Sequence, residues 1–322
     1  GRNYIIPNVF DERVPRAVLD EHYAHGYDKG ITVLIPSYVE QPKVVAKTIW
    51  SAALKEFPDL AVVLLIDDPP HPKNDESRRI LEACRSLVPS ILDELARPAK
   101  RFTEHRNLAT KALAGQVHAR RSIVARCADD YRAAVRWLDA KADYWPIEDH
   151  TDEFFCDQVL RGLARDLRQT EDALNDAVNL HDPVPAERIV QLYNRLVWIF
   201  TVKGWSFERK QYISLSQEGN KAMNLNSFIG LMGHRVKREE TADGVVLRDV
   251  RPGEVPDFVL RDSEYVLTLD ADSMLLRDYC IRLVYQLEQP GDEHVAVIQA
   301  PCPSRRGAPT RIERIAAATT HV

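Results

Sequence analysis

Two short runs of β-forming apolar residues, Ile31–Ile35 and Leu60–Ile66, predict two buried strands. The first run stops at Pro36, so the first strand is expected to close there. Between the runs, apolar positions recur at helical spacing from Pro42, a favourable first helical residue, to about Phe57. Strand, helix and strand in this order form a βαβ unit, whose right-handed crossover makes the two strands parallel.

A third apolar run, Tyr265–Leu269, predicts another strand that is buried on both faces. Asp270 and Asp272 follow it, separated by one alanine. Two carboxylates at i and i+2 beyond a strand's carboxyl end can converge on Mg²⁺ or Mn²⁺ and leave positions open for substrate phosphates. The alternative is that Asp270 caps a helix beginning near Met274, with Asp272 solvated in the same turn.

The region from 74 to 203 has a different hydrophobic pattern, because its apolar positions recur at helical spacing throughout. Pro89 is expected to break or kink the first helix. The absence of proline between Pro98 and Pro146 predicts one long helix there. Two further helical stripes cover Phe154–Leu180 and the residues after Pro185. These patterns predict a large all-helical insertion with solvated charged faces.

From Gly204 onward the pattern returns to short elements. It predicts a short strand at Tyr212–Leu215, a helix from Gly219 to about Met232, a hairpin turn at Asp243-Gly244, an amphipathic helix at Tyr279–Leu287 and a strand at His294–Gln299. The helix after Gly219 carries lysine and asparagine in its first turn. It therefore suits an anion site, and a merely solvated helix start is the equal alternative.

These elements indicate an α/β protein with a mostly parallel, Rossmann-like sheet flanked by helices. Residues 1–30 form an irregular lead-in. Residues 31–73 and 204–322 are the two halves of one α/β domain, and the helical insertion of 74–203 separates them. The second half carries the Asp-x-Asp pair.

The composition excludes some classes of protein but does not identify the function. Hydrophobic residues make up 45% and charged residues 28% of the chain, which is typical of a soluble globular protein. The net charge of −5 gives no basic field for nucleic acid. The five cysteines are scattered, so reduced thiols are expected. No apolar run approaches the ~20 residues of a membrane span. We therefore expect a cytoplasmic protein, or one held at the cytoplasmic face of a membrane by segments absent from this chain.

Four segments in this order resemble family 2 glycosyltransferases, particularly the cellulose-synthase-like branch. They are IPSYVE at Ile35–Glu40, LLIDD at Leu64–Asp68, NKAMNLN at Asn220–Asn226 and LTLDADS at Leu267–Ser273. The resemblance covers residues 31–72 and 204–318, outside the helical insertion. It implies a GT-A fold, in which a Rossmann-like sheet binds a nucleotide-sugar donor at its carboxyl edge.

The resemblance also implies roles for individual residues at the donor's nucleoside. Pro36, Tyr38 and Glu40 would flank the uracil and ribose of a UDP-sugar. Asp67 or Asp68 would accept hydrogen bonds from the nucleoside, as a carboxylate can from a diol or a base N–H.

Further positions are implied at the diphosphate. Lys221 would meet it as a positive point charge, and Asp270 and Asp272 would hold the Mg²⁺ or Mn²⁺ that neutralises it. Gln299-Ala300-Pro301 resembles the strand end that follows in this family. The family's later acidic motif with the general base, its Gln-x-x-Arg-Trp segment and its transmembrane helices are not found. We therefore expect either a donor-binding part of a longer protein, with the base beyond Val322, or an atypical member.

The function predicted is metal-dependent transfer of a sugar, with inversion, from a nucleotide-diphosphate donor to a polysaccharide or glycoconjugate acceptor. Glu264 and Asp278 lie near the acidic pair in sequence, but nothing selects either as the base. The alternative is a catalytically silent GT-A-like module whose helical insertion docks a protein partner. The chain lacks the glycine-rich loops of a nucleotidyltransferase or a dinucleotide dehydrogenase.

Overall fold

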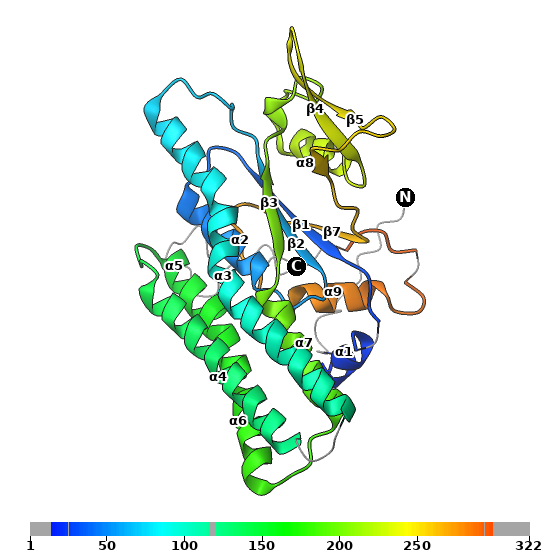
Figure 1. Cartoon of the computed structure of the whole chain (residues 1–322). Coiled ribbons are helices and arrows are strands. Elements are labelled where there is room, and N and C mark those ends of the chain that lie inside the picture. Colours follow the sequence, from blue (N-terminus) through cyan, green and yellow to red (C-terminus); the bar gives the residue numbers. More distant parts are fainter. Residues whose placement is uncertain (1–13, 25, 116–119, 293, 299–322) are drawn as a thin grey trace. The chain divides into compact units, whose positions relative to one another are not determined.

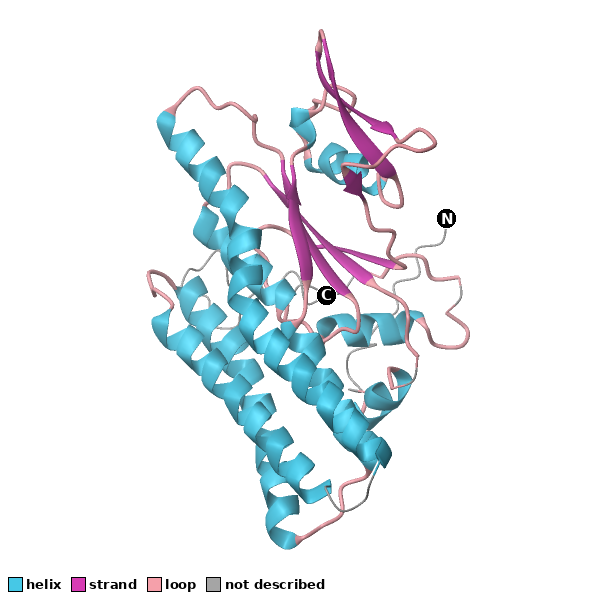
Figure 2. Ribbon diagram, in the orientation of Figure 1, coloured by secondary structure: helices cyan, strands magenta, loops and turns pink. Residues whose placement is uncertain are grey.

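A computed structural model of the chain describes residues 14–24, 26–115, 120–292 and 294–298. The chain forms two compact units, Gly1–Ile281 and Arg282–Val322. The first unit contains a parallel sheet, a group of long helices and a small antiparallel sheet (Figures 1 and 2).

The parallel sheet has four strands in the order β3-β2-β1-β7. Its strands are β3 (Lys203–Phe207), β2 (Leu60–Ile66), β1 (Ile31–Ser37) and β7 (Tyr265–Thr268). Every residue of β1 and β2 is buried, which explains their continuous apolar runs. The α/β class, the parallel β1–β2 pair and the helix between them, α2 (Pro42–Ala53), are confirmed. All four strands point the same way, so their carboxyl ends meet at one edge of the sheet.

Two strand predictions need correction at their ends. β1 continues through Pro36 to Ser37 instead of closing at Ile35. The pairing of β1 with β7 reaches only Leu34, so the N–H that proline lacks is not needed there. β7 is not buried on both faces, because its residues alternate between half-buried and exposed.

Two strands were missed after residue 202, β3 and the short β6 (Phe258–Val259), and one segment there was wrongly predicted as a strand. The sequence of β3, KGWSF, contains no apolar run because it pairs only with β2 in the described sheet. Tyr212–Leu215 is not a strand. Its tyrosine is buried in the core beside Phe207, where the two rings stack at 5.9 Å, so the apolar residues reflect packing and not sheet pairing.

Long helices fill the chain between β2 and β3 (Figure 1). Pro89 and Pro98 both lie inside the first helix without ending it, while buried side chains continue on both sides of them. The single helix expected between Pro98 and Pro146 is wrong, because one helix ends at Gly115 and the next begins at Arg120. The elements are α3 (Asp75–Gly115), α4 (Arg120–Tyr144), α5 (His150–Phe154), a π-helix (Phe155–Leu160), α6 (Arg161–Leu180) and α7 (Ala186–Phe200).

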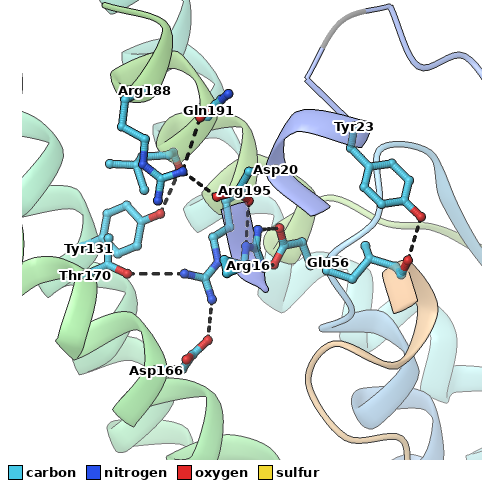
Figure 3. A network of polar contacts seen from close by, with 12 residues as sticks. Arg16, Asp20, Tyr23, Glu56, Tyr131, Asp166, Thr170, Arg188, Gln191 and Arg195 are labelled. Atoms are coloured by element: carbon cyan, nitrogen blue, oxygen red, sulfur yellow. Dashed lines mark hydrogen bonds and ion pairs between the residues drawn. The ribbon is translucent and has the colours of Figure 1, made fainter. Parts of the chain in front are cut away.

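A buried ionic network joins these helices to the sheet. Helix α1 (Arg16–His22), which lies within the predicted irregular lead-in, supplies Arg16. Figure 3 shows Arg16 and Arg195 of α7 converging on Glu56, which precedes β2. The Arg16 Nη1–Glu56 Oε2 distance is 2.7 Å, and Asp20 binds both Arg16 and Arg188. Removing one member would leave a charge buried without its partner, so the network fixes how these elements meet.

A second group of elements packs near the carboxyl edge. Helix α8 (Lys221–Ile229) begins where predicted, and its Phe228 shares a core with Phe207. The predicted hairpin is confirmed: β4 (Arg235–Thr241) and β5 (Gly244–Asp249) are antiparallel. The short β6 (Phe258–Val259) completes this small sheet on the other side of β4.

The amphipathic helix at its predicted position is confirmed as α9 (Tyr279–Leu287). Residues 294–298 form no strand, so that part of the predicted His294–Gln299 strand is wrong. Gln299-Ala300-Pro301 lies outside the described residues.

The cysteines and the hydropathy of the helices bear on two further predictions. Four cysteines in the described part of the chain are buried and free of disulfides: Cys84, Cys127, Cys156 and Cys280. None of the helices in the described ranges is long and apolar enough to cross a membrane.

Candidate functional site

The loops that leave the four parallel strands gather polar residues at the carboxyl edge of the sheet. Tyr38 follows β1, Asp67 follows β2, Arg209 follows β3 and Asp270 follows β7. Ligands of open α/β sheets bind beyond this edge. The segments singled out by sequence therefore meet in one place, and each can be described from its contacts.

The acidic pair lies on a loop whose side chains alternate between interior and solvent. Leu269 and Ala271 are buried, whereas Asp270 and Asp272 are exposed. The loop turns through a hydrogen bond from Ser273 N to Asp270 O at 2.9 Å. No helix begins near Met274, so the interpretation of Asp270 as a helix cap is wrong. The two aspartates, separated only by Ala271, are therefore both accessible to solvent.

Lys221 brings a second motif to this pair. Its ammonium forms an ion pair with the Asp270 carboxylate, and both side chains are more than half exposed. Asn220 fixes the start of α8, because its side chain accepts a hydrogen bond from Met223 N at 2.8 Å. Asn224, one turn on, donates from Nδ2 to Leu65 O at 2.9 Å and so ties the helix to the end of β2. The lysine and the acidic pair, 49 residues apart in sequence, are thus neighbours.

The two aspartates after β2 have different surroundings. Asp67 is 3% exposed and accepts a hydrogen bond from Arg209 Nε at 2.8 Å. Arg209 is fully buried and also donates to the carbonyls of Ser216 and Glu218, in the loop before α8. Asp67 and Arg209 therefore tie β2 to that loop. The sequence left open whether Asp67 or Asp68 accepts hydrogen bonds from the nucleoside. Because Asp67 already accepts one from a buried arginine, Asp68 is favoured for that role.

Asp68 is only half buried and faces the loop after β1. Both of its carboxylate oxygens lie 3.3 Å from the Val39 N–H. Burial raises the pKa of the Asp68 carboxyl, while the Val39 N–H and the Lys210 ammonium act in the opposite direction. Val39 has a φ of 55°, an unfavourable conformation for a β-branched residue, and such strain is often found at functional loops.

The residues predicted at the nucleoside differ in exposure. Pro36 is buried within β1, Glu40 is half-buried, and Tyr38 is exposed. Lys210 Nζ lies 5.4 Å from the centre of the Tyr38 ring and 2.5 Å from Asp67 O. Tyr38 therefore presents an aromatic surface with a cation beside it.

Arg209 and Lys210 were not identified as site residues from the sequence. They follow β3, which the hydrophobic pattern did not predict. The sequence therefore provided no reason to place them at the carboxyl edge of the sheet. A basic pair directly after a strand, combined with knowledge of the strand order, would have found them.

The chemistry of the acidic pair fits a hard divalent cation. Among the described residues there is no cluster of three or more His, Cys, Asp or Glu side chains that could enclose a metal ion. Asp270 and Asp272 would supply two oxygen ligands, and Mg²⁺ commonly takes the remainder from water and substrate phosphates. The exposed pair leaves space for those ligands.

Comparisons of the chain with protein-family models, curated proteins and solved structures find no match. The residues at the carboxyl edge of the sheet are therefore what indicates the function of this chain.

Proposed function

We propose that this chain binds the donor of a metal-dependent, GT-A-type glycosyltransferase, a nucleotide-diphosphate sugar for which UDP is the favoured nucleotide. The observation that carries the proposal is the contact of Lys221 with Asp270 beyond the ends of four parallel strands. A lysine beside an acidic pair offers the two charge types that a metal–diphosphate complex needs.

Each polar group at the carboxyl edge that is not fully buried has a defined part in this proposal. Asp270 and Asp272 hold Mg²⁺ or Mn²⁺, which when bound neutralises charge on the leaving diphosphate. Lys221 donates to a diphosphate oxygen. Asp68 accepts from the ribose or the base, and Tyr38 stacks on the base. Electrostatic help of this kind is most effective where charge develops during bond breaking.

Transfer to a glycan or glycoconjugate hydroxyl, with inversion at the anomeric carbon, also requires a general base. Glu264 lies before β7 and lines a cleft at the opposite, amino edge of the sheet. Asp278 interacts electrostatically with the buried Lys55. Neither carboxylate belongs to the group at the carboxyl edge. This favours a second candidate function: a module that binds the nucleotide without transferring sugar, and whose helical insertion docks a protein partner.

Calorimetric titration of UDP, with and without Mn²⁺, tests donor binding. We expect Mn²⁺ to strengthen UDP binding. With Mn²⁺ present, Asp272→Asn should lower the UDP affinity at least about tenfold. Asp262→Asn is the matched control, because Asp262 is an exposed aspartate at the amino edge. Equal UDP affinity in the wild type and Asp272→Asn, with Mn²⁺ present, would contradict the site.

Hydrolysis of a UDP-sugar separates the two candidate functions. Slow release of UDP by the chain with Mn²⁺, abolished in Asp272→Asn, would support a catalytic role. Mn²⁺-dependent UDP binding without any turnover would favour the binding module.

A further inference from the structure

We propose that Thr48 and Ser51 of α2 are positioning residues, which hold the Asp270–Asp272 loop in its metal-binding geometry. This inference rests on the proposed function, because it concerns the same acidic pair. Neither residue touches the metal or the nucleotide in the proposal. Each acts on the backbone that carries the two carboxylates.

Thr48 binds the residue between the two aspartates. Its side chain is fully buried, and Oγ1 donates to Ala271 O at 2.6 Å. A buried threonine in a helix often binds the carbonyl four residues earlier. Here that carbonyl, of Val44, lies 3.5 Å away, so the bond to Ala271 is the closer one.

Ser51 holds the other end of the loop, one turn further along α2. Its fully buried Oγ accepts a hydrogen bond from Leu275 N at 3.0 Å and donates to Thr48 O at 2.8 Å. Each hydroxyl thus binds the loop separately, Thr48 at the Ala271 carbonyl and Ser51 at the Leu275 N–H. Both serine and threonine are mediocre helix formers, and the burial of both hydroxyls against one loop accounts for their presence on this helix face.

The loop depends on such contacts because it has no regular secondary structure. Leu269 N donates to Leu34 O at 3.0 Å, which marks the end of pairing with β1. Beyond that bond, Thr48 and Ser51 connect the loop to α2. Ala271 and Leu275 are buried, whereas Asp270 and Asp272, on either side of Ala271, are exposed.

α2 itself is a firm support. Lys47, adjacent to Thr48, is buried and donates to Asp152 Oδ1 at 2.9 Å. Asp152 also binds Lys43 and the N–H groups of Glu148 and Asp149. The hydroxyls are therefore carried by a helix that is anchored on its other side to the helical insertion.

The test compares buried threonines at the two edges of the sheet. Thr48→Val removes the hydroxyl at nearly constant volume, and Thr48→Ser keeps it. Thr32→Val is the matched control, because Thr32 is also buried and its Oγ1 lies 2.6 Å from Ser263 Oγ, beside the first residues of β1. Mn²⁺ affinity in the presence of UDP is measured by calorimetry, UDP affinity is measured without metal, and urea unfolding measures stability.

We expect Thr48→Val to weaken Mn²⁺ binding about tenfold, in the range found for groups that orient metal ligands. Thr48→Ser should retain wild-type Mn²⁺ affinity, and UDP affinity without metal should be unchanged in both. Thr32→Val should lose stability but no Mn²⁺ affinity. Ser51→Ala should weaken Mn²⁺ binding in the same direction, and it decides the matter if Thr48→Val does not fold.

Three results would overturn the inference. Equal Mn²⁺ affinity in Thr48→Val, Thr32→Val and the wild type removes the positioning role while leaving the proposed function intact. Equal loss in Thr48→Val and Thr48→Ser shows that packing, not the hydroxyl, matters. Absence of any Mn²⁺ binding by the wild-type chain with UDP refutes the proposed function, and the positioning role with it.

Discussion

The two edges of the parallel sheet carry similar charged side chains in opposite arrangements. At the amino edge, Asp59 is held by Arg261, at 2.8 Å, and by Lys203, at 3.0 Å, in a cleft of about 430 Å³. Arg261 lies so close over Gly30 that a side chain there would have to displace the guanidinium. At the carboxyl edge, Asp270 meets only a flexible, half-exposed lysine among the described residues.

The difference lies in what holds each carboxylate. A planar guanidinium bound through two nitrogens fixes Asp59 in place and satisfies its oxygens. Asp270 is fixed through its backbone, and its side chain meets a point charge on a flexible stem. An acidic residue at a strand end is therefore not by itself a site. It becomes a candidate when its backbone is held and its oxygens remain exchangeable.

The largest effect is expected where the carboxyl edge is anchored. Arg209→Met would leave Asp67 buried without its partner, so we expect the free energy of unfolding to fall by about 3–5 kcal/mol. Urea unfolding measures it. The same variant should weaken UDP binding, because Arg209 also holds the loop before Lys221. A loss below 1 kcal/mol would show that the pair does not anchor the edge.

The next largest effect on the free energy of unfolding is expected from Lys55, a buried lysine that follows α2. Burial lowers the pKa of Lys55 to about 8, whereas the unfolded side chain titrates near about 10.4. Between these values the unfolded chain binds a proton that the folded protein has released, so the contribution of Lys55 to stability rises with pH. Below pH 8 the folded protein carries the full cost of a buried charge.

Lys55→Met removes that cost, and we expect it to be more stable than the wild type by about 3 kcal/mol at pH 7. The difference should shrink toward zero near about pH 10.4, where the lysine is neutral in the fold. Urea unfolding of both proteins from pH 7 to pH 10 measures it, with the exposed Lys203→Met as control. Parallel pH profiles for Lys55→Met and the wild type would contradict the lowered pKa.

The elements that sequence patterns predicted are those whose packing is uniform along the segment. β1 and β2 are continuous apolar runs, and α2 has apolar residues at helical spacing, so local rules sufficed. β3 failed those rules because only its last residue, Phe207, is buried. The contact of Arg209 with Asp67 spans 142 positions, and no local pattern encodes such a pair.

The candidate site was predictable to a similar extent. The proximity of Lys221 and Asp270 was expected only from the resemblance to family 2 glycosyltransferases, which implied that both residues lie at one diphosphate. The pairing of Asp67 with Arg209 was not predicted, because it depends on a buried arginine after an unpredicted strand. The contact of Thr48 with the loop was not predicted either, because sequence periodicity does not show which group a hydroxyl binds.

Removing the exposed Lys221–Asp270 ion pair should have a smaller effect, which weakens UDP binding and strengthens Mn²⁺ binding. Lys221→Met should weaken metal-free UDP binding about tenfold, because a charge-assisted bond to phosphate is lost. It should leave the free energy of unfolding within about 0.5 kcal/mol of the wild type, as for other exposed pairs. Mn²⁺ alone should bind the variant more tightly, because Asp270 is no longer paired. Lys203→Met is the control, and an equal change in its UDP affinity would argue against a local effect.

The smallest effect is expected at the amino edge. Burial acts to raise the pKa of Asp59, but hydrogen bonds from Lys203 and Arg261 lower it below its usual value. Their stabilisation is present above about pH 4 and is lost as the pH falls through the lowered pKa. Because Asp59 is 38% exposed, we expect Arg261→Met to reduce the free energy of unfolding at pH 7 by only about 1 kcal/mol, with the difference from the wild type shrinking at pH 3. UDP and Mn²⁺ affinities should not change. A loss as large as that of Arg209→Met would mean that both edges are anchored alike, and the contrast between them would no longer locate the site.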